Sequence, residues 1–87
     1  MFIVMVYDVR EERVNRVLKV GRKYLTWIQN SVLEGEITEA KYEKLKYELR
    51  NAINEKADSV IFYVNRTRRY LKKEIVGMEK NKTSMII

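Results

Sequence analysis

Asp8 is the first residue in this chain whose type and position could support chemistry. It follows an unbroken apolar run at residues 2–7, whose β-branched and aromatic side chains favour a strand that is covered on both faces. A carboxylate at the exit of such a strand lies where an α/β sheet usually presents its ligands. The alternative is that Asp8 only begins the next loop or caps the next helix, which is a common role for aspartate.

The residue types that the chain lacks restrict the reactions it could catalyse. Its 87 residues include neither cysteine nor histidine, which excludes a Cys/His zinc site, a Ser-His or Cys-His nucleophile and an imidazole general base. Any hydrolysis must therefore rely on carboxylates, a hard metal ion, hydroxyls or lysine. The chain is 46% hydrophobic, which is enough for one small globular domain.

Basic residues outnumber acidic ones, and the formal net charge of +6 favours a polyanionic partner such as nucleic acid. Two groups of cations are candidates for phosphate contacts. The first is a stripe along the helix predicted after Asp8, and the second is a basic turn with the residues that follow it. The stripe comprises Arg16, Lys19 and Lys23, and the turn group comprises Arg66, Arg68, Arg69, Lys72 and Lys73. Either group could instead be an ordinary solvated face.

Two helices and a sheet are predicted to position these candidates. Apolar residues recur every three or four positions in two segments, which indicates amphipathic helices. They are Val14, Val17, Leu18, Gly21 and Leu25 in the first helix, and Tyr42, Leu45, Leu49, Ala52 and Ile53 in the second, which Thr38 is predicted to cap. Residues 26–37 predict one bent strand or two short ones, with a bulge at Gly35. Residues 60–64 predict another apolar strand, and residues 70–76 its hairpin partner.

One face of the predicted sheet has no cover within the chain. Two helices can cover one face, but the strands at 2–7 and 60–64 are apolar on both faces. A second copy of the same sheet is the simplest cover, so we predict an obligate two-fold homodimer. The apolar tail at 85–87 could then add a strand to the partner's sheet. Two Asp8 side chains meeting across the axis could share one Mg²⁺ that keeps several waters and activates one of them.

Nothing in the sequence predicts a membrane protein. The N-terminal apolar run lacks a basic leader, so we predict no signal peptide, and no stretch is long enough to span a bilayer. We therefore expect a cytoplasmic protein with no membrane partner. One domain is expected at residues 1–78, followed by a linker and C-terminal strand at 79–87.

Several segments, in this order, resemble the family of small CRISPR-associated spacer-acquisition proteins, which are partners of the CRISPR integrase. They are Tyr7-Asp8-Val9 after the apolar strand, an Arg-rich first helix, QNSVLEG at 29–35, Thr38 at the start of a helix, and DSVIFY at 58–63. The resemblance covers nearly the whole chain. This chain departs from the pattern at Trp27, where some members have arginine, and at Leu33, where many have phenylalanine.

The resemblance implies an α+β, ferredoxin-like βαββαβ fold with an extra C-terminal strand, in a homodimer packed through its sheets. It implies that Asp8 is the catalytic residue and the Mg²⁺ ligand, and that Arg13 and Arg16 are the family's basic residues at the start of the first helix. Members are described as Mg²⁺-dependent endonucleases on single-stranded RNA or double-stranded DNA, or as bridges between two integrase dimers. We therefore predict a CRISPR adaptation protein that binds DNA or RNA. A toxin-like metal-dependent endoribonuclease of related fold, acting outside CRISPR, is the alternative.

Overall fold

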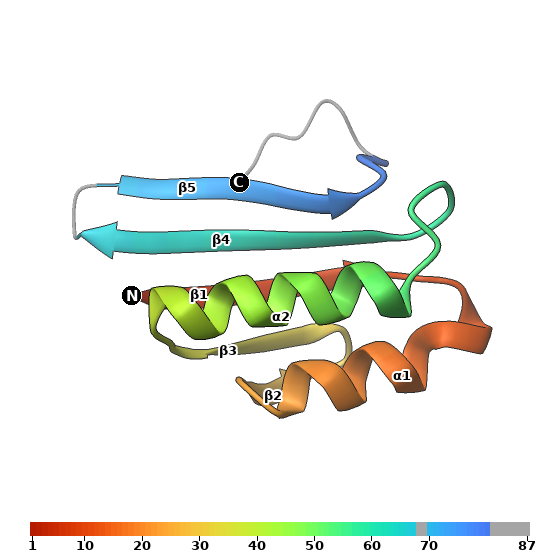
Figure 1. Ribbon diagram of the computed structural model, residues 1–87, viewed down its shortest axis with the longest axis horizontal. Helices are drawn as coiled ribbons and strands as arrows, with labels where there is room; N and C mark the ends of the chain where they lie inside the picture. The colour runs from red at the N-terminus through yellow and green to blue at the C-terminus, as the bar shows by residue number, and fades with distance from the viewer. Residues whose placement is uncertain (68–69, 81–87) are drawn as a thin grey trace.

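The fold is a five-stranded antiparallel sheet with two helices, seen in a computed structural model that describes residues 1–67 and 70–80 (Figure 1). The elements are β1 (Phe2–Asp8), α1 (Glu11–Arg22), β2 (Thr26–Gln29), β3 (Val32–Glu36), α2 (Glu39–Ala52), β4 (Ser59–Thr67) and β5 (Tyr70–Gly77). The strand order is β2-β3-β1-β4-β5, so β1 lies at the centre between β3 and β4. The predicted α+β class and the βαββαβ order with an added strand are confirmed. Neither helix is long and apolar enough to cross a membrane within the described ranges.

The core lies between the sheet and the two helices, which pack on the same face of it (Figure 1). Alternate residues of β1 and β4 point into this layer, so Ile3 and Met5 are fully buried together with Phe62. The apolar stripes predicted for both helices face the core. Gly21 allows α1 to approach the sheet, because a Cβ atom there would lie 3.0 Å from Leu33 Cδ2.

The region between the helices forms two strands, which decides between the alternatives left open by the sequence. β2 and β3 pair antiparallel, and Asn30 in the turn between them has a positive φ of 42°. The predicted bulge is misplaced: the register shifts between Trp27 and Gln29, whereas Gly35 pairs regularly with Ile3. Thr38 caps α2 as predicted, since its Oγ1 accepts a hydrogen bond from the Lys41 amide at 3.2 Å.

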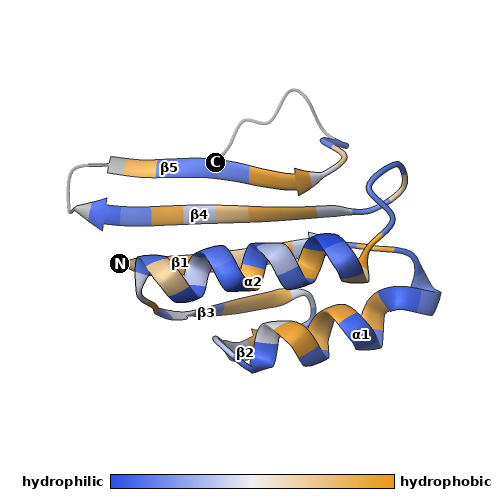
Figure 2. Ribbon diagram, viewed as in Figure 1, coloured by the Kyte–Doolittle hydropathy of each residue, from blue (hydrophilic) through white to orange (hydrophobic). Residues whose placement is uncertain are grey.

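The predicted basic turn is shorter than expected, because β4 continues to Thr67 and pairs with β5 over most of its length. The apolar residues at the end of β5 lie beside the apolar start of β4, and polar residues occupy the middle of β5 (Figure 2). Arg68 and Arg69 lie outside the described residues, as do the predicted tail strand at 85–87 and the rest of residues 81–87.

The second face of the sheet carries no helix and is only half-buried. Val4 lies on this face between Glu34 of β3 and Tyr63 of β4 in the strand register. Val6 and Ile61 are register neighbours further along, and both are partly exposed. The apolar character on both faces of β1 and β4 that the sequence predicts is therefore present. This face is called the open face below, and its partly exposed apolar residues are Phe2, Val4, Val6, Val32, Ile61, Tyr63 and Ile75.

Candidate functional site

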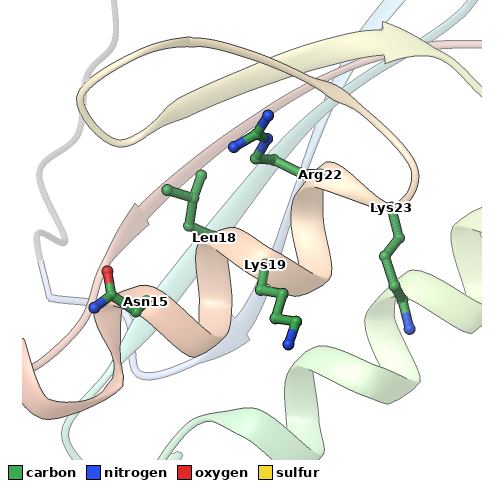
Figure 3. Close-up of a pocket in the computed structure, with 5 residues that line it drawn as sticks. All are labelled: Asn15, Leu18, Lys19, Arg22 and Lys23. Carbon is green, nitrogen blue, oxygen red and sulfur yellow. The ribbon is translucent and has the colours of Figure 1, made fainter.

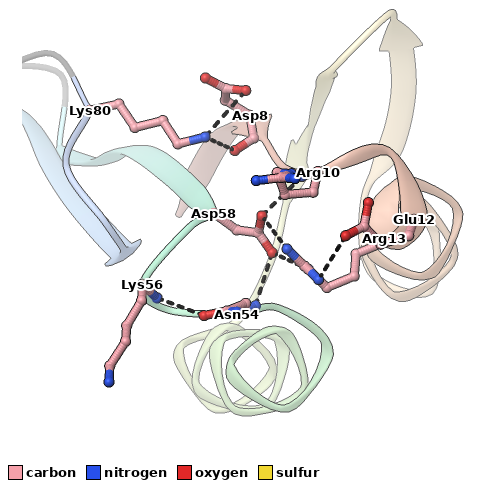
Figure 4. A network of polar contacts seen from close by, with 8 residues as sticks. All are labelled: Asp8, Arg10, Glu12, Arg13, Asn54, Lys56, Asp58 and Lys80. Atoms are coloured by element: carbon pink, nitrogen blue, oxygen red, sulfur yellow. Dashed lines mark hydrogen bonds and ion pairs between the residues drawn. The ribbon is translucent and has the colours of Figure 1, made fainter.

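Asp8 is the last residue of β1, and its side chain is 75% exposed. The Lys80 ammonium lies 3.6 Å from Asp8 Oδ1 and donates a hydrogen bond to the Asp8 carbonyl oxygen at 3.2 Å (Figure 4). The N-cap residue of α1 is Arg10, and no side chain caps that end. Asp8 is therefore not a helix cap. Its carboxylate faces solvent at the carboxyl end of the central strand, beside one cation.

A second aspartate, Asp58, lies just before β4 and is fully buried. Its Oδ1 accepts hydrogen bonds from the Arg10 amide at 2.9 Å and from Arg13 Nη2 at 3.0 Å. Its Oδ2 accepts hydrogen bonds from Arg13 Nε and from the Asn54 amide, the latter at 2.9 Å (Figure 4). One carboxylate therefore joins the start of α1 to the loop after α2. These residues are called the Asp58 clamp below.

The Asp58 clamp keeps its carboxylate ionised. The Arg13 guanidinium holds the pKa of Asp58 well below its usual range, and the Asn54 and Arg10 amides act in the same direction, against the effect of burial. The sequence analysis did not single out Asp58. The available signal was an acidic residue directly before an apolar strand, in a chain that has arginines after its first strand. The pairing of Asp58 with Arg13 could not be predicted from it, because the two residues lie in segments far apart in the chain.

The two arginines expected at the start of α1 have different surroundings. Arg13 is only 19% exposed, and its third nitrogen, Nη1, faces Glu12 at 3.5 Å. A phosphate that contacts Arg13 would therefore have to compete with carboxylates. Arg16 is exposed, and so is Lys19 one turn further along the same helix. Neither makes an ion pair within the part of the chain that the structure describes.

The other predicted cations that the structure describes are partly neutralised. Lys23 forms an ion pair with Glu48, which raises the pKa of the lysine. Arg66 donates to Glu39 through Nη2 at 3.1 Å and Nε at 3.4 Å. Further along the hairpin, Lys72 and Lys73 lie 3.6 Å from Glu74 and Glu79, respectively. The structure thus leaves the middle of α1 with the most accessible positive charge among these candidates.

A hollow of about 450 Å³ borders this accessible part of α1. It is lined by Asn15, Leu18, Lys19, Arg22 and Lys23 (Figure 3). The Arg22 guanidinium lies 5.7 Å from the ring centre of Trp27, which is 45% exposed on β2. Arg22 and Trp27 were not among the predicted binding residues, although the sequence places an arginine and a tryptophan five residues apart. Together they extend the basic surface of α1 towards the sheet edge.

The described residues contain no group of three or more acidic side chains close enough to hold a metal ion together. At the end of β1, one chain therefore offers Asp8 as a lone carboxylate ligand. Mg²⁺ binds through one or two carboxylates and retains several waters, so one Asp8 from each of two chains would fit its preferences.

Comparison with known proteins agrees with this architecture. The family model described as CRISPR associated protein Cas2 matches residues 1–73. A Dictyoglomus turgidum protein named CRISPR-associated endoribonuclease Cas2 is 60% identical over 87 residues, and the match covers all of both chains. A Thermotoga maritima protein of the same name is 52% identical, with 99% of each chain covered.

Solved structures give the same result. A crystal structure of Cas2 matches with a TM-score of 0.74 and 40% identity, and the alignment covers 100% of this chain and 98% of that one. The Streptococcus pyogenes Cas2 structure matches with a TM-score of 0.69 and 35% identity, covering 75% of this chain and 86% of that one. The resemblance inferred from the sequence is therefore confirmed, and this chain belongs to the Cas2 family of CRISPR-associated proteins.

Proposed function

We propose that this chain acts in CRISPR adaptation as a homodimer that binds nucleic acid and hydrolyses phosphodiester bonds in an Asp8-dependent reaction. The observation that carries this proposal is the exposed Asp8 carboxylate at the end of the central strand. The endoribonuclease names of the relatives support the reaction class. The family assignment favours this role over a toxin-like ribonuclease acting outside CRISPR.

In the proposed reaction, the two Asp8 carboxylates of the dimer would hold one Mg²⁺. The ion would supply an activated water and polarise the phosphate, chemistry that a chain without cysteine and histidine could not otherwise provide. Arg16 and Lys19 hold the backbone phosphates of the substrate. The Lys80 ammonium lies 3.6 Å from Asp8 Oδ1, so it would have to move aside for a metal ion to reach the carboxylate. Water would add to phosphorus and one P–O ester bond would break, leaving one strand end with a phosphate and the other with a hydroxyl group.

The open face supports the proposed dimer. Exposed apolar residues gathered on one face of a domain mark interaction sites, and a second copy of the sheet would cover this face with matching chemistry. Both helices occupy the other face, so the open face is available for a partner (Figure 1). We propose that the two sheets pack through this face, with residues 79–87 adding contacts to the partner.

Val6→Lys tests the dimer. Val6 lies on the open face between Val32 and Ile61, so the substitution places an ammonium among apolar side chains. Burying an unpaired charge there would cost several kcal/mol, so we expect a monomer at micromolar concentration. Sedimentation velocity would measure the mass. Tyr47→Lys is the matched control, because Tyr47 is exposed on α2, away from the open face, and should leave the dimer intact. A wild-type protein that sediments as a monomer would contradict the proposed dimer.

A second proposed role needs no chemistry: the homodimer grips duplex DNA and bridges integrase dimers. The basic surface of α1 and the net charge of +6 per chain, +12 per dimer, favour this role. Binding of this kind depends on phosphates, so it should be strongly salt-dependent and weakly sequence-specific. The nuclease and adaptor roles are compatible, since they use different groups of the same surface.

Neutralising Arg16 and Lys19 tests the phosphate contacts. The double variant Arg16→Gln/Lys19→Gln should weaken duplex binding and reduce the slope of log K against log salt by about one for each phosphate that is no longer bound. Binding at several salt concentrations, measured by fluorescence anisotropy, gives the slope. Lys41→Gln/Lys44→Gln on α2 removes the same charge and should leave the slope almost unchanged. Equal slopes in the two double variants would remove α1 from the binding surface.

The proposed reaction is tested by metal removal. Labelled single-stranded RNA and double-stranded DNA are incubated with the dimer in Mg²⁺ or in EDTA. Cleavage that requires Mg²⁺ supports the nuclease role and identifies the preferred substrate. Absence of cleavage of both substrates in Mg²⁺ would contradict it and leave the DNA-binding adaptor as the function.

A further inference from the structure

The Asp58 clamp contacts three chain segments that lie next to Asp8. Its carboxylate binds the Arg10 amide, two residues after Asp8, and its main-chain oxygen accepts the Met78 amide at 2.8 Å, two residues before Lys80. The residue after Asp58 is Ser59, the register partner of Asp8 in the sheet. Asp58 thus connects the loop after β1, the start of β4 and the segment after β5 (Figure 4).

The contacts on the two carboxylate oxygens explain how this connection is maintained. Each carboxylate oxygen of Asp58 accepts two hydrogen bonds. These four bonds fix the loop between β1 and α1 against the loop after α2. Arg13 binds both oxygens with two of its nitrogens, the geometry that makes arginine–carboxylate pairs strong and directional. Asp8 itself has no such restraint on its side chain, which is exposed and touches only Lys80 among the described residues. Its position therefore depends on its backbone neighbours.

We propose that Asp58 is a positioning residue for the Asp8 site: the clamp holds the loop that follows Asp8 and the adjacent start of β4, so that the Asp8 carboxylate is presented for the metal ion. This inference rests on the proposed function of Asp8. Asp58 is fully buried, so its carboxylate is not accessible to a substrate or a metal ion. It acts through Arg10 and Arg13, in the way that residues behind a metal ligand hold that ligand in its orientation.

Asp58→Asn is the informative variant. The amide keeps the size of the carboxylate but presents one oxygen and one NH₂ group, so two of the four donors lose their acceptor. Mn²⁺ alone serves as the probe, because it prefers the same oxygen ligands as Mg²⁺ and its free form is measured directly by electron paramagnetic resonance. We expect Asp58→Asn to weaken Mn²⁺ binding by about tenfold, the usual loss when a residue that orients a ligand is changed.

Glu74→Gln is the matched control. Glu74 is a half-buried carboxylate that accepts hydrogen bonds from Tyr42 Oη and Lys46 Nζ. Its register partner in β4 is Phe62, away from the part of β4 next to Asp8. A purely structural role for Asp58 would make both variants less stable and leave the Mn²⁺ affinity of folded protein unchanged. Equal affinity in wild type and Asp58→Asn, measured below their melting temperatures, would overturn the inference.

Two further measurements separate the possible failures. If wild type and Asp8→Asn bind Mn²⁺ equally, the proposed metal site at Asp8 fails, and the positioning role fails with it. If Asp58→Asn does not fold, Arg13→Lys replaces it: the lysine keeps the charge but cannot bind both oxygens with two nitrogens. A loss of Mn²⁺ affinity in folded Arg13→Lys supports the inference, and wild-type affinity in that variant overturns it.

Discussion

Asp8→Asn is expected to reduce Mg²⁺-dependent cleavage by about a thousandfold while the protein stays folded. A bound metal ion contributes several kcal/mol to the stabilisation of a phosphoryl transition state, and about 4 kcal/mol corresponds to that factor. Asparagine keeps the shape of the side chain but removes the negative charge that would hold the metal ion. The carboxylate is 75% exposed and pairs only with Lys80 in the described part of the chain, so its loss should hardly change stability.

The experiment compares cleavage rates of the wild type, Asp8→Asn and Glu11→Gln. Glu11 is an exposed acid in the first turn of α1, so its variant makes the same change of charge close to the site and should keep wild-type activity. Thermal unfolding and DNA binding are measured on the same samples, and both should persist in Asp8→Asn. Equal cleavage by wild type and Asp8→Asn would indicate a contaminating nuclease and leave the adaptor role.

Asp58→Ala is expected to cause the largest loss of stability, about 3–5 kcal/mol in the free energy of unfolding. The substitution removes a fully buried carboxylate and leaves the Arg13 guanidinium and two backbone amides without their acceptor. A typical domain has only about 5–15 kcal/mol in total, so the variant should be marginal at room temperature. Urea unfolding at fixed protein concentration measures the change. Asp8→Ala is the control and should lose less than about 1 kcal/mol.

Acid should remove the same contribution in the wild type. The clamp lowers the pKa of Asp58 in the folded protein, whereas an unfolded chain has the ordinary value of 3.8. The stabilisation is therefore fully present above that pH and is lost as the pH falls below it towards the folded pKa. The difference in unfolding free energy between wild type and Asp58→Asn should shrink between about pH 5 and pH 2. A constant difference over this range would show that the pKa of Asp58 is the same in the folded and unfolded protein, which would contradict the effect of the clamp.

Much of the fold could be predicted because the signals are local. The spacing of Val14, Val17 and Leu18 predicts a helix wherever it occurs in a chain, and Thr38 caps α2 through an amide three residues away. The apolar run before Asp8 likewise predicts a strand and places the acid at its exit. The limits of the strands were harder to predict, because Asn65 and Arg66 belong to β4 only through their pairing with neighbouring strands.

In the candidate site, too, the features with local signals could be predicted, and those that depend on long-range contacts could not. Sequence patterns alone predict an acid at the end of the first strand, a basic helix and membership of the family, and the composition excludes thiol and imidazole chemistry. Two contacts required the folded chain: Arg13 binds Asp58, 45 residues away, and Lys80 reaches Asp8 across 72 residues. The physical reason is that β1 pairs with β4, which brings the ends of distant segments together around Asp8 and buries Asp58 among donors that no local pattern identifies.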